Sequence, residues 1–178
     1  QQQAADMGVV LIPMTVRFGT KEYRSGIDIT NEEFYQMLTT SKETPSTSQP
    51  TPFEYEQAYE RIVKEGDQVI VLCVSSALSG TYQSAVIAAD GYEGSVYVID
   101  TRAVSLGQKI LLDYAISLEK SGMNTEAIVA ELEKKKNDIR VYGAVDTLEY
   151  LIRGGRLSKA AGAVGSVLGI RPVLFLTD

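Results

Sequence analysis

The sequence lacks histidine altogether and contains a single cysteine, Cys73, among its 178 residues. The absence of histidine excludes Ser-His-Asp and Cys-His catalytic machinery within this chain, because both need an imidazole base. One cysteine without histidine also excludes a zinc site of the usual ligand set and any disulfide within the chain. Cys73 lies in an apolar run, so we expect a buried thiol in a protein of a reducing compartment. We predict no metal site.

Positive charge is not in excess, and long apolar runs are missing. The 17 basic and 23 acidic residues give a net charge of -6, which argues against a nucleic-acid partner, since nucleic acids are bound by basic faces. No apolar stretch reaches the roughly 18 residues of a membrane-spanning helix, and residues 1–6 lack the layout of a signal peptide. We therefore expect a cytoplasmic protein without stable membrane insertion.

Strand and helix signals alternate along the chain. Strands are predicted at residues 9–18, 68–74, 95–99, 140–145 and 171–176, where β-branched and apolar residues gather. The run at 68–74 is nearly unbroken, which is typical of a strand covered on both faces. Helices are predicted to begin near residues 30, 51, 81, 105 and 124. The signals at 30 and 51 are capping boxes, formed by Thr30 with Glu33 and by Thr51 with Glu54.

This alternation predicts an α/β fold with a parallel sheet flanked by helices, because parallel strands need crossover connections. After Asp146 the pattern changes to a short helix, a helix of small residues and the strand at 171–176. We assign residues 1–140 to one α/β ligand-binding domain and residues 141–178 to the beginning of a second α/β domain. Since a final strand needs a partner and a cover, we expect the chain to be a fragment.

Ligands of parallel α/β sheets bind beyond the carboxyl ends of the strands, and a serine-rich loop at residues 75–81 follows the strand at 68–74. It opens a helix at Gly80, whose N-terminus offers unpaired N–H groups, and Ser79 and Thr81 add hydroxyl donors. Such a loop suits an anion. Serines are also favoured as plain helix caps, and the loop alone does not decide between anion binding and helix capping.

A second polar cluster, at residues 44–50, carries the hydroxyls of Ser46, Thr47 and Ser48 between prolines. In isolation it is typical of a linker. The helix that starts at Thr51 directly after it adds a second helix N-terminus, and two such ends meeting at one spot would hold an anion without lysine or arginine. Further along, residues 154–156 read Gly-Gly-Arg, a pattern that ends a helix and lets the arginine bond the freed carbonyls.

Aspartates follow two of the predicted strands, at Asp100 and Asp146. Their expected role is to form turns or caps. The chain contains neither the glycine-rich dinucleotide loop nor the phosphate loop of nucleotide-binding proteins. No nucleotide cofactor is therefore predicted.

Three segments together resemble the DegV family of bacterial fatty-acid-binding proteins, and the match extends over essentially the whole chain. Residues 44–52, T-P-S-T-S-Q-P-T-P, are similar to the family's T-S-Q-P signature. Residues 75–85, S-S-A-L-S-G-T-Y-Q-S-A, are similar to its S-S-x-L-S-G-T segment. Residues 146–156 contain the D-T-L-E-Y-L and G-G-R of its third segment.

The resemblance implies a carrier that binds a long-chain fatty acid between two domains and presents its carboxylate to a fatty acid kinase. Thr47 and Ser79 match the family's carboxylate-binding threonine and serine, and Gly80 adjoins them. The same clusters supply supporting side chains, namely Ser46, Ser48, Ser76 and Thr81. Arg156 is assigned to contact with the partner. The implied ligand is palmitate, stearate or oleate, with no cofactor and no catalytic activity of the protein's own.

The sequence departs from the family pattern in two respects. The usual first strand with its T-D-S motif is absent, as is the region of about a hundred residues that completes the second domain and often adds a histidine to the site. An alternative function remains open. Sugar-phosphate isomerase-type domains also place a Ser-Gly-x-Thr loop after a parallel strand, and Ser79-Gly80-Thr81 resembles half of it.

Overall fold

A computed structural model describes residues 2–41, 43–158 and 171–176 of the chain. Its first elements are α1 (Gln2–Asp6), β1 (Thr15–Phe18), β2 (Lys21–Arg24), α2 (Asn31–Thr40) and β3 (Ser46–Ser48). The three strands form an antiparallel sheet with the order β2-β1-β3. This sheet therefore places the polar segment after α2 against the edge of β1.

The structure corrects the prediction for this region. The strand expected over residues 9–18 is confined to Thr15–Phe18, and β2 and β3 were not predicted. Both are short and polar, so they lack the apolar alternation by which a strand is recognised in a sequence. They depend on pairing with β1, where Val16 and Phe18 are buried.

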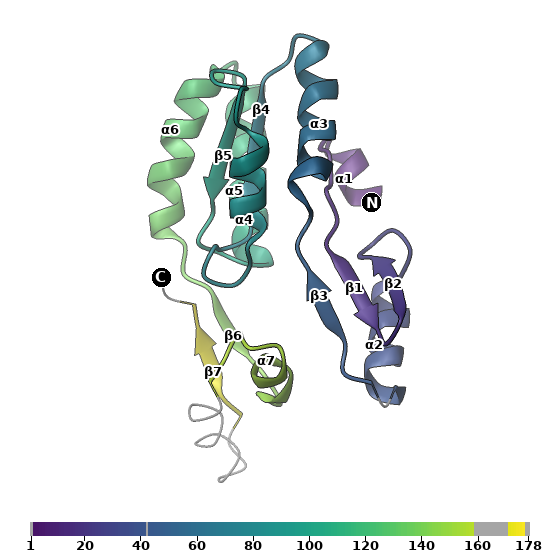
Figure 1. The fold of residues 1–178 in the computed structure, drawn as a ribbon. Helices are drawn as coiled ribbons and strands as arrows, with labels where there is room; N and C mark the ends of the chain where they lie inside the picture. The colour runs from purple at the N-terminus through teal and green to yellow at the C-terminus, as the bar shows by residue number, and fades with distance from the viewer. Residues whose placement is uncertain (1, 42, 159–170, 177–178) are drawn as a thin grey trace.

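The remaining elements before residue 140 are α3 (Pro52–Lys64), β4 (Val69–Cys73), α4 (Thr81–Ala88), β5 (Val96–Asp100), α5 (Leu106–Lys120), α6 (Thr125–Lys135) and the 3-10 turn η1 (Lys136–Asp138). β4 and β5 pair in parallel, in register from Val69 opposite Val96 to Cys73 opposite Asp100. The predicted parallel sheet with flanking helices is thereby confirmed. Figure 1 shows α3 and α6 on opposite sides of this strand pair.

Alternate side chains of β4 enter two separate cores. Val69, Val71 and Cys73 pack with α3 and α4, whereas Ile70 and Leu72 pack with α5 and α6. This alternation follows from the two-residue period of a strand. Every residue of β4 and β5 is buried or half-buried, as expected for strands covered on both faces. The second core is centred on Ile99, Leu111, Ile128 and Leu132.

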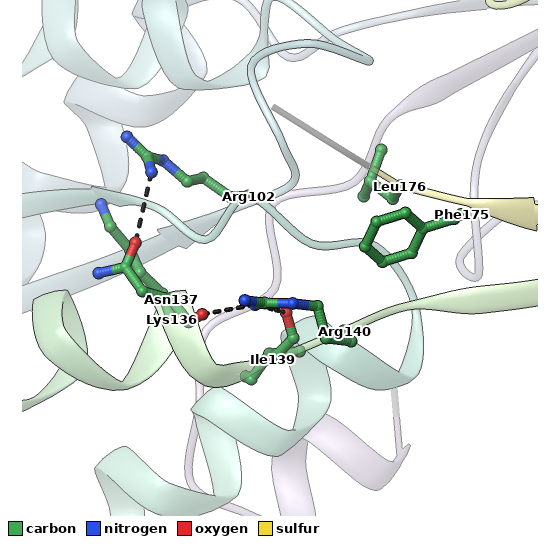
Figure 2. Close-up of a pocket in the computed structure, with 7 residues that line it drawn as sticks. All are labelled: Arg102, Lys136, Asn137, Ile139, Arg140, Phe175 and Leu176. Carbon is green, nitrogen blue, oxygen red and sulfur yellow. Dashed lines mark hydrogen bonds between the residues drawn. The ribbon is translucent and has the colours of Figure 1, made fainter.

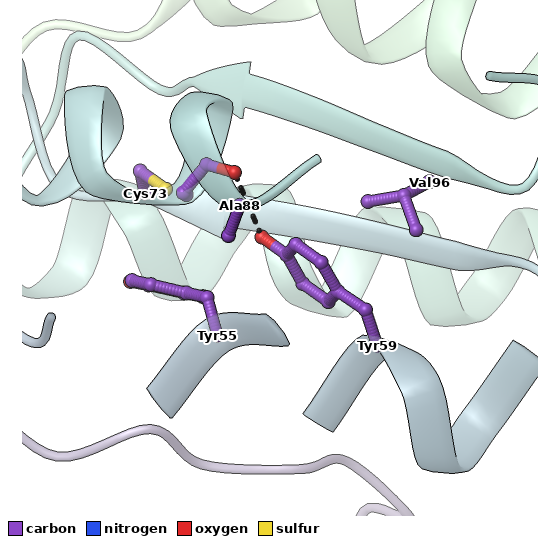
Figure 3. Close-up of a cluster of buried hydrophobic side chains, with 6 residues drawn as sticks. Tyr55, Tyr59, Cys73, Ala88 and Val96 are labelled. Carbon is purple, nitrogen blue, oxygen red and sulfur yellow. Dashed lines mark hydrogen bonds between the residues drawn. The ribbon is translucent and has the colours of Figure 1, made fainter. Parts of the chain in front are cut away.

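The core between the sheet and α3 contains aromatic and sulfur groups (Figure 3). The Tyr59 hydroxyl donates a hydrogen bond to the carbonyl oxygen of Ala85 on α4, at 3.3 Å. Burial raises the pKa of both Tyr55 and Tyr59 above the usual range of a phenol. Cys73 is 1% exposed in the same cluster, which confirms that its thiol is a buried side chain.

Both predicted capping boxes are present. The Thr51 hydroxyl oxygen accepts the N–H of Glu54, and the Glu54 carboxylate accepts the N–H of Thr51. Thr30 and Glu33 repeat this arrangement at the start of α2. These caps satisfy N–H groups that the helix itself leaves unpaired. The beginning of α3, immediately after the polar segment 44–50, is therefore determined by local sequence.

The last described elements are β6 (Tyr142–Ala144), α7 (Glu149–Arg153) and β7 (Val173–Phe175). β6 confirms the strand predicted at 140–145, but it pairs antiparallel with β7 and forms a sheet separate from β4 and β5. Figure 1 shows this unit below the parallel pair. The helix of small residues predicted after Gly155 lies outside the described residues. No helix in the described part of the chain is both long and apolar enough to cross a membrane.

Candidate functional site

The loop of residues 75–80 connects β4 to α4 and is anchored by the turn that follows β5. The N–H of Ser75 donates to the carbonyl oxygen of Ala103 at 2.9 Å. The Asp100 carboxylate accepts the N–H groups of Ser76, at 3.2 Å, and of Arg102, at 3.0 Å. Asp100 therefore has the turn-forming role predicted for it, and it fixes the start of the serine loop.

Two hydroxyls meet where this loop enters α4. Ser79 Oγ lies 2.7 Å from Thr81 Oγ1, and it also accepts the N–H of Thr81 at 3.3 Å. Gly80 is the N-cap of α4, and no side chain makes the usual cap hydrogen bond there. When the Thr81 hydroxyl donates in this pair, the proton of Ser79 stays available for another acceptor. Thr81 is only 6% exposed, so its hydroxyl orients Ser79 from below the surface.

Gly80 brings the two predicted clusters into contact. A Cβ atom added at Gly80 would come within 2.7 Å of Cδ and Nε2 of Gln49. The Gln49 amide therefore occupies the space over the glycine. Gln49 Nε2 donates to the hydroxyl of Ser84, one turn into α4, at 2.9 Å. Sequence reasoning did not single out Gln49, although it belongs to the T-S-Q-P segment.

Thr47 lies in the middle of β3, opposite Val16 of β1, and is exposed. Gln49 follows the end of β3, and Pro50 after it disfavours a helical conformation there, so the backbone from Thr47 to Gln49 is extended. Within β3, Thr47 points to one side of the strand and Ser46 and Ser48 point to the other. As the cross-strand partner of Val16, Thr47 lies on the same face of the sheet as that residue.

An open hollow of about 400 Å³ lies between residues 76–80 and residues 154–156. Ser76, Ser79, Gly80 and Arg156 all line it, whereas Ser46, Thr47, Ser48 and Thr81 do not. The hollow therefore unites the serine loop with the Gly-Gly-Arg segment.

Two arginines tie the third segment to the other two. Arg156 Nε donates to the carbonyl oxygen of Leu78 at 3.0 Å, and its NH1 group donates to that of Gly154 at 2.7 Å. Arg153 NH1 donates to the hydroxyl of Thr44 at 3.2 Å. Gly155 has a φ of 75°, as predicted for a glycine at a helix end. Sequence reasoning did not foresee that Arg156 places a cation at the serine loop.

A second hollow, of about 380 Å³, lies apart from these segments (Figure 2). Arg102, Lys136 and Arg140 line it together with Phe175, and none of the predicted carboxylate-binding residues is among its lining residues. Lys136 forms an ion pair with Glu133, and Arg140 donates to the carbonyl oxygen of Asn137. These cations serve the end of α6. Within the described ranges no group of His, Cys, Asp and Glu side chains is arranged to hold a metal ion.

Comparison with known proteins gives one consistent family. The profile described as an uncharacterised protein of the DegV family matches residues 1–178. A DegV domain-containing protein of Caldanaerobacter subterraneus subsp. tengcongensis is 38% identical over 96% of this chain and 61% of its own length. One from Staphylococcus aureus is 34% identical over 94% of this chain and 60% of its own. The chain thus spans about three fifths of these relatives.

Solved structures agree with the sequence matches. A DegV family protein from Thermus thermophilus, described by its fatty acid binding, superposes with a TM-score of 0.88 at 38% identity, over 99% of this chain and 63% of that one. DegV from Bacillus subtilis, described as a fatty acid binding protein, gives 0.85 at 35% identity, over 99% and 64%. A stearic acid-binding protein from Eubacterium ventriosum gives 0.85 at 29% identity, over 100% and 63%. This chain belongs to the DegV family.

Proposed function

We propose that the protein binds a long-chain fatty acid, such as palmitate, stearate or oleate, by its carboxylate and presents it to a fatty acid kinase. The protein itself acts as a carrier without catalytic activity or cofactor. The fatty acid binding described for the relatives from T. thermophilus, B. subtilis and E. ventriosum supports this proposal. We further propose that the protein is cytoplasmic, that residues 1–140 form one domain and that residues 141–178 begin a second. The separate sheet of β6 and β7 supports that division.

The observation that carries the proposal is that the serine loop and the Gly-Gly-Arg segment line one hollow beside Ser79, while Gln49 of the third segment packs against Gly80. The N-terminus of α4 contributes a partial positive charge and the Ser79 hydroxyl a donor, while Arg156 lines the same hollow. Thr47 is two residues before Gln49, the residue that packs against Gly80. A carboxylate held mainly by neutral hydroxyls avoids a tight ion pair, whose desolvation and release are costly.

The carboxylate contacts supply orientation more than affinity. Each methylene of the acyl chain contributes about 0.8 kcal/mol when it is buried, before the entropic cost of binding. The openness of the hollow suits presentation, because a kinase must bring a phosphoryl group to a carboxylate oxygen. Thr47 and Ser79 are the proposed primary donors, with Gly80 beside them and with Ser46, Ser48, Ser76 and Thr81 in support. Arg156 is the proposed contact with the partner.

The proposal is tested by titrating oleate into the complete protein and its Thr47→Ala, Ser79→Ala and doubly substituted variants. A hydrogen bond to a charged group contributes about 1.5 to 3 kcal/mol, so each single substitution should weaken binding roughly tenfold to a hundredfold. The double substitution should be less than additive if both hydroxyls serve one carboxylate. Ser117→Ala is the control, because that exposed hydroxyl donates within α5, to the carbonyl oxygen of Tyr114.

Unchanged affinity in all three folded variants would remove Thr47 and Ser79 from the site. Native mass spectrometry of the purified protein adds an independent arm. We expect a bound fatty acid, and a bound sugar phosphate with turnover and no lipid would favour the isomerase-type alternative.

A further inference from the structure

The side chain of Gln49 joins two segments that lie 35 residues apart in sequence. Its amide lies against Gly80, where a methyl group would displace it. Its Nε2 atom donates to Ser84, a hydroxyl that is 3% exposed. A buried hydroxyl without a partner is costly, so the Gln49 amide satisfies a group that water does not reach.

The backbone that carries Gln49 is held on both sides. Pro50 follows it and is buried, and the capping box of Thr51 begins α3 one residue later. On the other side, β3 is paired with β1 up to Ser48. Since the backbone is constrained, contact of the amide with α4 fixes where β3 lies relative to the N-terminus of α4.

We propose that Gln49 is a positioning residue of the carboxylate site, an inference that rests on the proposed function. Thr47 and Gln49 are two residues apart in extended backbone, which separates them by about 7 Å. Ser79 directly precedes Gly80, the residue against which the Gln49 amide packs. The amide therefore sets the spacing between the hydroxyls of Thr47 and Ser79, without touching the ligand itself.

Gly80 is the other half of this contact. A methyl group at residue 80 would displace the amide of Gln49, because it would approach Cδ and Nε2 to 2.7 Å. Gly80→Ala should thus have the same effect on ligand binding as loss of Gln49. In the doubly substituted Gln49→Ala, Gly80→Ala protein the loss of ligand affinity should be less than additive, because both substitutions remove the same contact.

The experiment measures binding of oleate and of methyl oleate to the complete protein and to its Gln49→Ala variant. Methyl oleate has the same acyl chain and no carboxylate. We expect Gln49→Ala to weaken oleate binding about fivefold to tenfold, the equivalent of one hydrogen bond, and to leave methyl oleate binding unchanged. Gln108→Ala is the matched control, because that amide also makes a long-range hydrogen bond, to the carbonyl oxygen of Leu72. It should leave both affinities as they are.

Oleate affinity of Gln49→Ala within twofold of the unsubstituted protein would overturn the inference, as would equal weakening of both ligands. The latter result would indicate general damage to the acyl-binding region. If the unsubstituted protein binds no oleate, the proposed function fails and the inference fails with it. If Gly80→Ala does not fold, the comparison of the two ligands with Gln49→Ala still decides the question.

Discussion

The thiol of Cys73 should be almost inert in the folded protein. Cys73 ends β4 and is 1% exposed. Burial is the main cause that raises the pKa of the Cys73 thiol to about 12; a hydrogen bond with Tyr55 lowers it, and the carboxylate of Asp100 raises it further. The thiolate is the reactive form of cysteine, so a raised pKa means slow reaction.

The size of the effect follows from the two pKa values. At about pH 8, a thiol with the ordinary pKa of 9.0 is roughly one tenth thiolate, and one with a pKa of about 12 is roughly one ten-thousandth thiolate. A disulfide reagent such as Ellman's should therefore react about a thousandfold more slowly with the native protein than with the protein in guanidinium chloride. Steric exclusion should slow it further. This reasoning would be refuted if the reagent reacted equally fast with both samples while the protein without denaturant kept its native circular dichroism.

The same shift predicts how stability depends on pH. The folded pKa of Cys73 lies above its ordinary value, so the unfolded state releases the proton first as the pH rises. Stability is complete below about pH 9 and falls above it, by at most about 1.4 kcal/mol per pH unit from this group. Urea titrations at about pH 8 and 10 should show the decline, and Cys73→Ala should lack this part of it. Equal declines in both proteins would contradict the assignment.

Two further predictions concern the elements around the site. Thr51→Ala removes the capping box of α3 and should lower the free energy of unfolding by about 1 kcal/mol, measured by urea denaturation. Thr51→Ser keeps the cap and serves as control; equal losses would contradict the role of the hydroxyl. Leu132→Ala empties a fully buried position on α6 and should cost about 2 to 5 kcal/mol. Leu132→Met, the control, should lower the free energy of unfolding by less than about 1.5 kcal/mol. If Leu132→Ala also loses less than about 1.5 kcal/mol, the second core is loosely packed.

Much of the local structure could be predicted from sequence because its causes lie within a few residues. Thr51, Pro52 and Glu54 specify the start of α3 by themselves, since all the cap's hydrogen bonds are local. The apolar run in β4 predicts a strand covered on both faces, and its side chains enter two cores. The three DegV-like segments also identified the family from sequence, because they are long and occur in a fixed order.

Other features depended on partners that are distant in the chain. The polar segment β3 is a strand because β1 pairs with it. β6 pairs with β7 and does not extend the parallel sheet of β4 and β5. Thr47 and Ser79 were predicted to bind one anion, and this stays a prediction.

The sequence by itself determined the helix caps, the buried thiol and the three segments that mark the family. Only the tertiary structure decided that Gln49 covers Gly80 and that Arg156 lies at the serine loop. The physical reason is the range of the interactions. Caps and strand periodicity act between neighbours in the chain, whereas an amide packed on a glycine 31 positions away exists only once the fold has brought the two together.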